Sequence, residues 1–267
     1  MKLPPFEYHA PQTVEEALEL LAGGAQVLAG GQSLLQLMKF RAVRPSVLVD
    51  INGVAGLDAI EERDGELHVG ALVRQQTLLE DETVARGWPL LREATKYVGY
   101  RATRHRGTVG GSLAFAAPWA ELTAAAVALE ARIEVRSASG ERALEARSFF
   151  LGPNRTALEP RELITGVRFP KSPPGAAFHE VSARYRDYAQ VAAAAVVTPG
   201  EKAEVVLLRV ADAPYVLDVE PGTLEFGDAL AGLTPPEDVE ASSTYRRRVA
   251  PVLARRALQE AAERAAA

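Results

Sequence analysis

The chain of 267 residues contains no cysteine. It therefore cannot supply thiolate ligands to an iron–sulfur cluster, form a disulfide or build a cysteine-type zinc site. Histidine is scarce as well, and its four copies show no metal-ligand spacing: His9, His68, His105 and His179. We assign no metal ligand, and we expect any redox chemistry to need an organic cofactor.

Long apolar segments are also absent. The longest, residues 122–129 and 191–197, are too short and too rich in alanine to span a bilayer. Residues 1–13 lack the continuous apolar region of a secretory signal. The net charge is −5 with both signs interspersed, so no basic patch indicates nucleic acid as a partner. We expect a cytoplasmic protein without a transmembrane segment.

The residues that are present predict three α+β units: 1–55, 56–170 and 171–267. In the first unit, Thr-Val-Glu-Glu at 13–16 is a capping box that starts an amphipathic helix. Short apolar strands are expected at 26–28 and 47–51, and a helical pattern begins at residue 34.

The second unit is expected to contain hairpins at 60–71 and 132–144, helices at 77–84, 89–98 and 121–130, and a final loop and strand at 149–170. A turn-rich linker at 171–175, Lys-Ser-Pro-Pro-Gly, precedes the third unit. There we expect strands at 177–182, 189–197, 203–210 and 216–220, followed by helices at 222–231 and 243–266.

Two glycine-rich segments stand out, Ala-Gly-Gly-Gln-Ser at 29–33 and Thr-Val-Gly-Gly-Ser at 108–112. Adjacent glycines let a backbone approach a ligand closely and direct successive N–H groups at it. The helix expected directly after the first segment adds positive potential suited to phosphate, and Ser33 could cap that helix or bind a phosphate oxygen.

Taken alone, each segment is more typical of a tight turn capped by serine. Neither has the spacing of a P-loop or of a Rossmann fingerprint. Only the two segments together indicate a dinucleotide with two phosphates.

Several stretches then match one family in order along nearly the whole chain. They are 28–40 (Leu-Ala-Gly-Gly-Gln-Ser-Leu-Leu-Gln-Leu-Met-Lys-Phe), 104–114 (Arg-His-Arg-Gly-Thr-Val-Gly-Gly-Ser-Leu-Ala), 187–189 (Asp-Tyr-Ala) and 245–250 (Tyr-Arg-Arg-Arg-Val-Ala). The chain resembles the FAD-binding medium subunit of molybdenum hydroxylases of the carbon monoxide dehydrogenase and xanthine dehydrogenase type.

The resemblance implies an α+β protein with a two-subdomain FAD-binding fold of the vanillyl-alcohol-oxidase or PCMH type, followed by a C-terminal α+β domain. It implies FAD as the cofactor and no catalytic side chain of the chain's own. Because the chain has no cysteine and no suitably placed histidine for a covalent link, we expect this FAD to be bound non-covalently. The implied cofactor-binding residues are Leu28, Ala29, Gly30, Gly31, Gln32, Ser33, Leu34, Thr108, Val109, Gly110, Gly111, Ser112, Glu121, Leu163 and Ile164.

Some of these residues have a simpler reading. Glu121 matches a position that contacts the polar groups of the flavin, but it is equally typical of an acidic residue at a helix N-terminus. Leu163 and Ile164 match an aliphatic position beside the isoalloxazine ring, but their sequence is more typical of a core strand. We further predict that valine at Gly110 or Gly111 would block the approach of FAD and leave the fold largely intact.

The sequence departs from the family pattern at two places. Ala117 stands where many members have an aspartate, which removes a hydrogen-bond acceptor near the cofactor. His179 and Glu180 stand where some relatives place a lysine near the flavin, so the charge around the flavin differs.

The resemblance also implies a function. The chain would be the flavin subunit of a hetero-oligomer that contains an iron–sulfur subunit and a molybdopterin subunit. It would take electrons from the clusters and pass them to an external acceptor: NAD, a quinone or oxygen. Two alternatives stay open, a free-standing FAD oxidoreductase of the same fold and a non-catalytic nucleotide-binding module.

Overall fold

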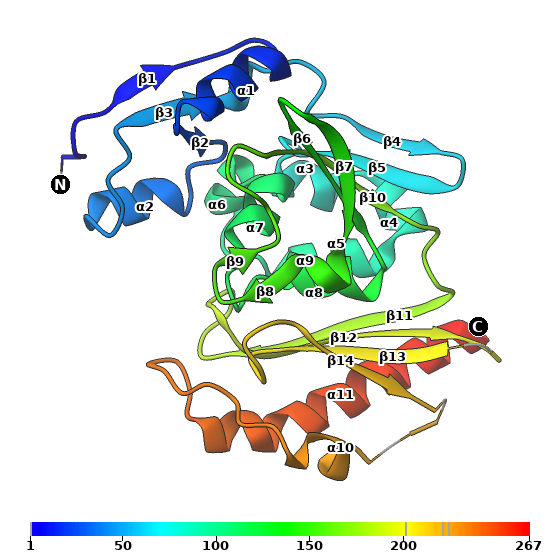
Figure 1. Cartoon of the computed structure of the whole chain (residues 1–267). Helices are drawn as coiled ribbons and strands as arrows, with labels where there is room; N and C mark the ends of the chain where they lie inside the picture. The colour runs from blue at the N-terminus through cyan, green and yellow to red at the C-terminus, as the bar shows by residue number, and fades with distance from the viewer. Residues whose placement is uncertain (1, 201, 221, 224) are drawn as a thin grey trace.

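The computed structural model describes residues 2–200, 202–220, 222–223 and 225–267. The strands form three main sheets, and each sheet lies within one of the three predicted units (Figure 1). Helices and strands are both abundant, so the α+β class is confirmed. The division at residues 55 and 170 stays a prediction, which the confinement of each sheet supports.

The first unit is built on three parallel strands in the order β1-β3-β2. Its elements are β1 (Glu7–His9), α1 (Val14–Ala22), β2 (Gln26–Leu28), α2 (Leu34–Lys39), β3 (Val47–Asp50) and the 3-10 helix η1 (Ile51–Gly53). Thr13 caps α1 as predicted, because its hydroxyl accepts the N–H of Glu16 at 3.2 Å. The carboxylate of Glu16 in turn accepts the N–H of Gln12 at 2.8 Å, so the backbone N–H groups of both Gln12 and Glu16 have an acceptor at this end of the helix.

The second unit is built on an antiparallel sheet in the order β4-β5-β10-β6-β7. Its strands are β4 (Ile60–Arg63), β5 (Glu66–Gly70), β6 (Arg132–Ser137), β7 (Gly140–Glu145), the small pair β8 (Phe150–Gly152) and β9 (Arg155–Thr156), and β10 (Leu163–Phe169). Its helices are α3 (Gln75–Glu80), α4 (Glu82–Gly87), α5 (Pro89–Tyr97), α6 (Arg101–Arg106), α7 (Val109–Phe115), α8 (Glu121–Ala128) and α9 (Ala146–Phe149).

Local chemistry explains two features of this unit. The hairpin predicted about Asp64 and Gly65 forms, with both residues at positive φ (52° and 79°), as a two-residue hairpin turn requires. The single helix predicted at 77–84 is wrong, because the chain breaks at Asp81 into α3 and α4. The Asp81 carboxylate accepts the N–H of Val84 at 2.9 Å and so begins the second helix.

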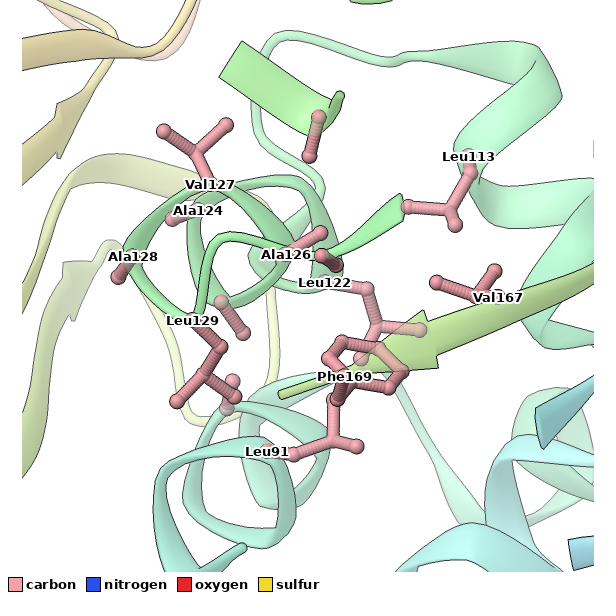
Figure 2. Packing of buried hydrophobic residues seen from close by; sticks show 14 of the residues in the cluster. Leu91, Leu113, Leu122, Ala124, Ala126, Val127, Ala128, Leu129, Val167 and Phe169 are labelled. Atoms are coloured by element: carbon pink, nitrogen blue, oxygen red, sulfur yellow. The ribbon is translucent and has the colours of Figure 1, made fainter. Parts of the chain in front are cut away.

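Helix α8 lies in the middle of the molecule, and all eight of its residues are buried. Figure 2 shows Leu122 and Ala126 on the side of the helix that faces Val167 and Phe169 of β10, whereas Ala124 and Ala128 lie on its other side. Small alanine side chains let a helix be covered on every side without overpacking. This helix therefore joins the second unit to the third, because it also contacts β12 and β13.

The third unit is an antiparallel sheet in the order β11-β12-β13-β14, with a long helix packed on one face (Figure 1). Its elements are β11 (Gly175–Ser182), β12 (Ala189–Thr198), β13 (Lys202–Leu208), β14 (Tyr215–Val219), α10 (Gly227–Ala231) and α11 (Ser243–Ala266). The predicted helix at 222–231 includes Leu224, which lies outside the described residues; the observed helix begins at Gly227.

Strand β12 is buried on both faces of this sheet. Ala192, Ala194 and Val196 belong to the cluster shared with α8 and α5, whereas Ala193 and Ala195 pack in the cluster on the α11 side. An apolar run without alternation is what a strand covered on both faces requires. Within the described residues, no helix is both long and apolar enough to cross a membrane.

Candidate cofactor-binding site

The first glycine-rich segment, residues 29–33, connects β2 to α2. Gly31 has φ of +73°, a conformation that favours glycine. Its carbonyl accepts the N–H of Leu35 at 3.2 Å. Ser33 does not cap α2, since its side chain makes no capping hydrogen bond. Among the residues that the structure describes, the backbone N–H groups of residues 30–34 have no hydrogen-bond acceptor, so this segment has unused donors to offer a ligand.

The second glycine-rich segment is not the loop that we predicted. Thr108 is the N-cap of α7, and Gly110 and Gly111 lie in the first turn of that helix. Its N–H groups are occupied: Val109 donates to the Val73 carbonyl at 3.0 Å and Gly110 donates to the Ala71 carbonyl at 2.9 Å. Gly111 donates to the Thr108 hydroxyl at 3.1 Å. This segment therefore shapes the site without offering its first amide groups to a ligand.

The prediction that valine at Gly110 would leave the fold intact is corrected by this geometry. A β-carbon on Gly110 would lie 2.6 Å from the β-carbon of Ala71 and 2.9 Å from its carbonyl oxygen. A β-carbon on Gly111 would lie 2.7 Å from the hydroxyl oxygen of Thr108. Both glycines are thus explained by packing within the protein, and a substitution at Gly110 has to move the backbone.

The two glycine-rich segments lie side by side although they are far apart in sequence. A β-carbon on Gly30 would lie 2.3 Å from the carbonyl oxygen of Arg106, and the β-carbon of Ala29 is 3.9 Å from the position of one on Gly111. The structure thus brings together the two segments that the sequence could only suggest as a pair. Of these two approaches, the one at Gly30 leaves no room for a side chain, and it is made to the residue that leads into the second segment.

A polar link joins the same two segments. The side-chain amide of Asn52 donates to the carbonyl of Ala29 at 2.9 Å, and its oxygen accepts from Arg74 at 2.6 Å. Arg74 donates to the carbonyl of Arg106 at 2.7 Å. The link therefore runs from the first segment, through two side chains, to the residues that lead into the second. Neither Asn52 nor Arg74 is among the site residues predicted from the sequence, because nothing in their local pattern marks them.

The predicted residues that flank the first segment are apolar and mostly enclosed. Leu28 is buried in a small cluster with Met38 and Leu48, and Leu34 packs against that cluster. The packing of Leu28 and Leu34 therefore holds the chain in place on both sides of the segment. The exposed Gln32 donates its side-chain amide back to the carbonyl of Gly30 at 3.3 Å.

Glu121 lies at the first position of α8 and is buried, with 7% of its surface exposed. Burial raises the pKa of its carboxyl group to about 8. Glu180, on β11, has both carboxyl oxygens buried without a hydrogen-bond partner in the described structure. Burial, and then the charge of Glu121, raise the pKa of Glu180 to about 9. The two neighbouring carboxyl groups therefore keep their protons at neutral pH.

The sequence offered only an indirect signal for Glu180. It is one of the two residues that stand where some relatives place a lysine, and its burial could not be foreseen from that departure. Neighbouring His179 points elsewhere, with its ring nitrogen 2.7 Å from Glu260 of α11.

Leu163 and Ile164 begin β10 and are buried, with 3% and 4% of their surface exposed. They point into different clusters: Leu163 packs with α1 residues in the first unit, and Ile164 packs in the central cluster. Both thus have a structural role as core strand residues. A contact of either one with the flavin stays a prediction. No cluster of histidine, aspartate and glutamate that could hold a metal ion is found in the described part of the chain.

Comparison with known proteins identifies the family. The family described as "FAD binding domain in molybdopterin dehydrogenase" matches residues 4–172. The chain is 38% identical to the 6-hydroxypseudooxynicotine dehydrogenase complex subunit alpha of Paenarthrobacter nicotinovorans, over 99% of this chain and 97% of the relative. It is 33% identical to the carbon monoxide dehydrogenase medium chain of Afipia carboxidovorans, over 97% and 98%.

Solved structures agree with these relatives. Quinoline 2-oxidoreductase from Pseudomonas putida 86 superposes with a TM-score of 0.92 at 35% identity, and carbon monoxide dehydrogenase from Hydrogenophaga pseudoflava with 0.91 at 32%; each alignment covers 99% of both chains. The predicted two-subdomain FAD-binding fold with a C-terminal α+β domain is confirmed, as is FAD as the cofactor. This chain belongs to the FAD-binding subunits of the molybdenum hydroxylases, and it is an oxidoreductase subunit.

Proposed function

We propose that this chain is the electron-transfer subunit of its complex, taking electrons from iron–sulfur clusters on a partner chain and passing them to an external acceptor. The observation that carries the proposal is the absence of cysteine from a chain of a flavin family. Since no thiolate is available here, any cluster that delivers electrons has to be held by another chain. The acceptor is NAD, a quinone or oxygen.

The names of the relatives support a partnership. They are called a complex subunit alpha, a medium subunit and a medium chain. We propose an iron–sulfur subunit and a molybdopterin subunit as the partners. The relatives are named for substrates as different as carbon monoxide, nicotine and caffeine, so we place substrate recognition on a partner chain rather than on this one.

The residues of the first segment fit FAD. Residues 30–34 offer backbone N–H groups without an acceptor in the described structure, and these would hold the diphosphate. The half-buried Ser112, whose segment lies against the first one, would hold the chain between diphosphate and ring. Bound FAD supplies the electron-accepting and electron-donating chemistry, which no side chain of this protein can supply.

The buried carboxyl groups would set the surroundings of the flavin. We propose that Glu121 donates a hydrogen bond from its protonated carboxyl group to a polar atom of the flavin, which an ionised carboxylate could not do. Burial keeps Glu121 in that state, and the charge that Glu121 would carry if ionised helps to raise the pKa of Glu180. Leu163 or Ile164 would contact the ring from the start of β10, the middle strand of the second sheet.

Purification of the chain by itself tests the proposal. We expect a yellow protein with one FAD, no iron and no molybdenum, which turns over no hydroxylation substrate. Its flavin should be reduced by a small chemical reductant and reoxidised by the physiological acceptor. Substrate turnover by the lone chain would favour a free-standing oxidoreductase instead. A chain that binds nucleotides but never FAD would favour a non-catalytic module.

A further inference from the structure

The polar link through Asn52 and Arg74 has no role yet in the proposed FAD site. Arg74 lies at the N-cap of α3, where it forms an isolated backbone bridge with Thr108. The next residue, Gln75, donates its N–H to the Gly107 carbonyl at 2.9 Å. The backbone around Arg74 is therefore already paired with the start of the second segment, and its side chain extends from there toward the first.

Both side chains of the link are held in place by further contacts. Asp50 accepts the side-chain amide of Asn52 at 2.5 Å and its backbone N–H at 3.0 Å. The other oxygen of Asp50 accepts the hydroxyl of Tyr8 at 2.7 Å. Burial alone would raise the pKa of Asp50, but the hydrogen bonds from Tyr8 and Asn52 lower it below its ordinary value. Ionised Asp50 thus holds the amide nitrogen of Asn52, and the amide oxygen of Asn52 is left to accept from Arg74.

Arg74 uses the two ends of its guanidinium group on two different acceptors. One end nitrogen donates to the side chain of Asn52 and the other to the backbone of Arg106. The planar, forked group suits such bridging, whereas a lysine ammonium acts as a point charge. Burial, and then the charge of Arg106, lower the pKa of Arg74, which nevertheless stays a cation at any physiological pH.

We propose that Asn52 and Arg74 are positioning residues that hold the two glycine-rich segments at the separation FAD requires. The inference rests on the proposed FAD site. Residues 30–34 have no internal acceptors to hold their amides in place. The carbonyl of Ala29, directly before them, is tied through Asn52 and Arg74 to the carbonyl of Arg106, and this tie sets their position relative to the second segment. A segment ordered before binding loses less entropy when the cofactor arrives, and binding is tighter and longer-lived.

Four variants of the full chain test this inference: Asn52→Ala, Arg74→Lys, Arg74→Gln and the double variant Asn52→Ala with Arg74→Lys. Arg142→Lys is the matched control, because Arg142 also bridges two partners, the carboxylate of Glu162 and the carbonyl of Ala157, on the outer hairpin. FAD is removed, and the dissociation constant and dissociation rate are measured by flavin fluorescence. The unfolding temperature of the FAD-free chain is measured in parallel.

We expect Asn52→Ala and Arg74→Lys each to weaken FAD binding about tenfold, the value of one hydrogen bond to a charged group, mainly through faster dissociation. The double variant should bind FAD no more weakly than Asn52→Ala or Arg74→Lys does, because each of these substitutions alone already breaks the same link. Arg142→Lys should bind FAD as the wild type does. A role limited to general stability would lower the unfolding temperature without this non-additive pattern in the dissociation rate.

Two results would overturn the inference while leaving the FAD site in place. The first is wild-type affinity for FAD in both Asn52→Ala and Arg74→Lys. The second is tight binding by Arg74→Lys with loss of binding by Arg74→Gln. The second result would mean that the charge of Arg74 touches the cofactor directly. If Asn52→Ala fails to fold, Arg74→Lys, which keeps the charge and the side-chain stem, still decides. The proposed site itself would be contradicted if the Gly30→Ala variant bound FAD as tightly as the wild type does, because FAD would then bind elsewhere.

Discussion

Gly110 donates its backbone N–H to the carbonyl oxygen of Ala71 at 2.9 Å, and a β-carbon on Gly110 would lie 2.6 Å from the β-carbon of Ala71. Helix α7 therefore packs against the end of β5 with no room for a side chain. We predict that Gly110→Ala lowers the free energy of unfolding of the FAD-free chain by about 2 kcal/mol, the usual cost of overpacking.

A second glycine provides the control for Gly110. Gly87 ends α4, and a β-carbon there would meet nothing within 4 Å. Gly87→Ala should leave stability unchanged or raise it by up to about 1 kcal/mol. Urea unfolding of both variants checks the pair. If Gly110→Ala unfolds as the wild type does but binds no FAD, the glycine serves the cofactor and not the packing.

Gly30 is predicted to act on binding more than on folding. A β-carbon at Gly30 would lie 2.3 Å from the carbonyl oxygen of Arg106, so Gly30→Ala has to push the two glycine-rich segments apart. We expect the dissociation constant of FAD to rise at least about tenfold, because the donors at residues 30–34 move from their places. Gly232→Ala, in open space in the third unit, is the control and should bind FAD normally. Equal affinity of the two variants would remove the first segment from the site.

The pair of Glu121 and Glu180 predicts how stability depends on pH. Their pKa values in the folded chain, about 8 and about 9, lie above the ordinary value of 4.5. The folded state therefore binds more protons than the unfolded state between these values. The stability contributed by the neutral pair is fully present below about pH 4.5 and is lost as the pH rises through about 8 to 9.

Glu180→Gln should flatten this dependence, since it removes the one of the two acids whose pKa is raised further. We expect the variant to exceed the wild type in unfolding temperature by about 3 °C at about pH 9, and by less at about pH 6. Differential scanning fluorimetry across this range gives the comparison. Parallel curves for the two proteins would show that Glu180 is ionised or solvated throughout.

FAD should be released intact by denaturation. The chain has no cysteine to form a thioether, and of its four histidines His179 is already paired with Glu260. We predict that acid or heat precipitates a colourless protein and leaves all of the flavin in solution, as absorbance of the two fractions will show. Flavin that stays with the pellet would indicate a covalent bond.

Much of the fold could be predicted from local signals. The N-cap at Thr13, the turn at Asp64-Gly65 and the apolar run of β12 each depend on neighbours in sequence, and each appears in the structure, although the Glu16 carboxylate of the predicted capping box accepts from Gln12 instead of Thr13. Helix α6 was missed, because its sequence, Arg-Ala-Thr-Arg-His-Arg, has no apolar face. It is held by tertiary contacts: the buried Arg104 donates to Gln76 and to two backbone carbonyls.

The site could be predicted only in part, for a physical reason. The resemblance predicts both glycine-rich segments in one site, and the structure places them side by side, but their hydrogen bonding depends on what lies opposite. At the second segment those neighbours are Ala71 and Val73, which occupy the amides that we expected a ligand to use. The link through Asn52 and Arg74 joins residues that are distant in sequence, so no local sequence pattern predicts it.

The central claim is that electrons reach this chain from clusters on a partner. The most direct test is stopped-flow absorbance of the anaerobic complex, assembled by co-expression with the proposed iron–sulfur and molybdopterin subunits. After substrate is added, the account predicts bleaching of the clusters first and of the flavin second. Flavin bleaching should be lost when the cluster-ligating cysteines of the partner are replaced. Flavin that is bleached at the same rate without clusters would contradict the account, because this chain would then oxidise the substrate itself.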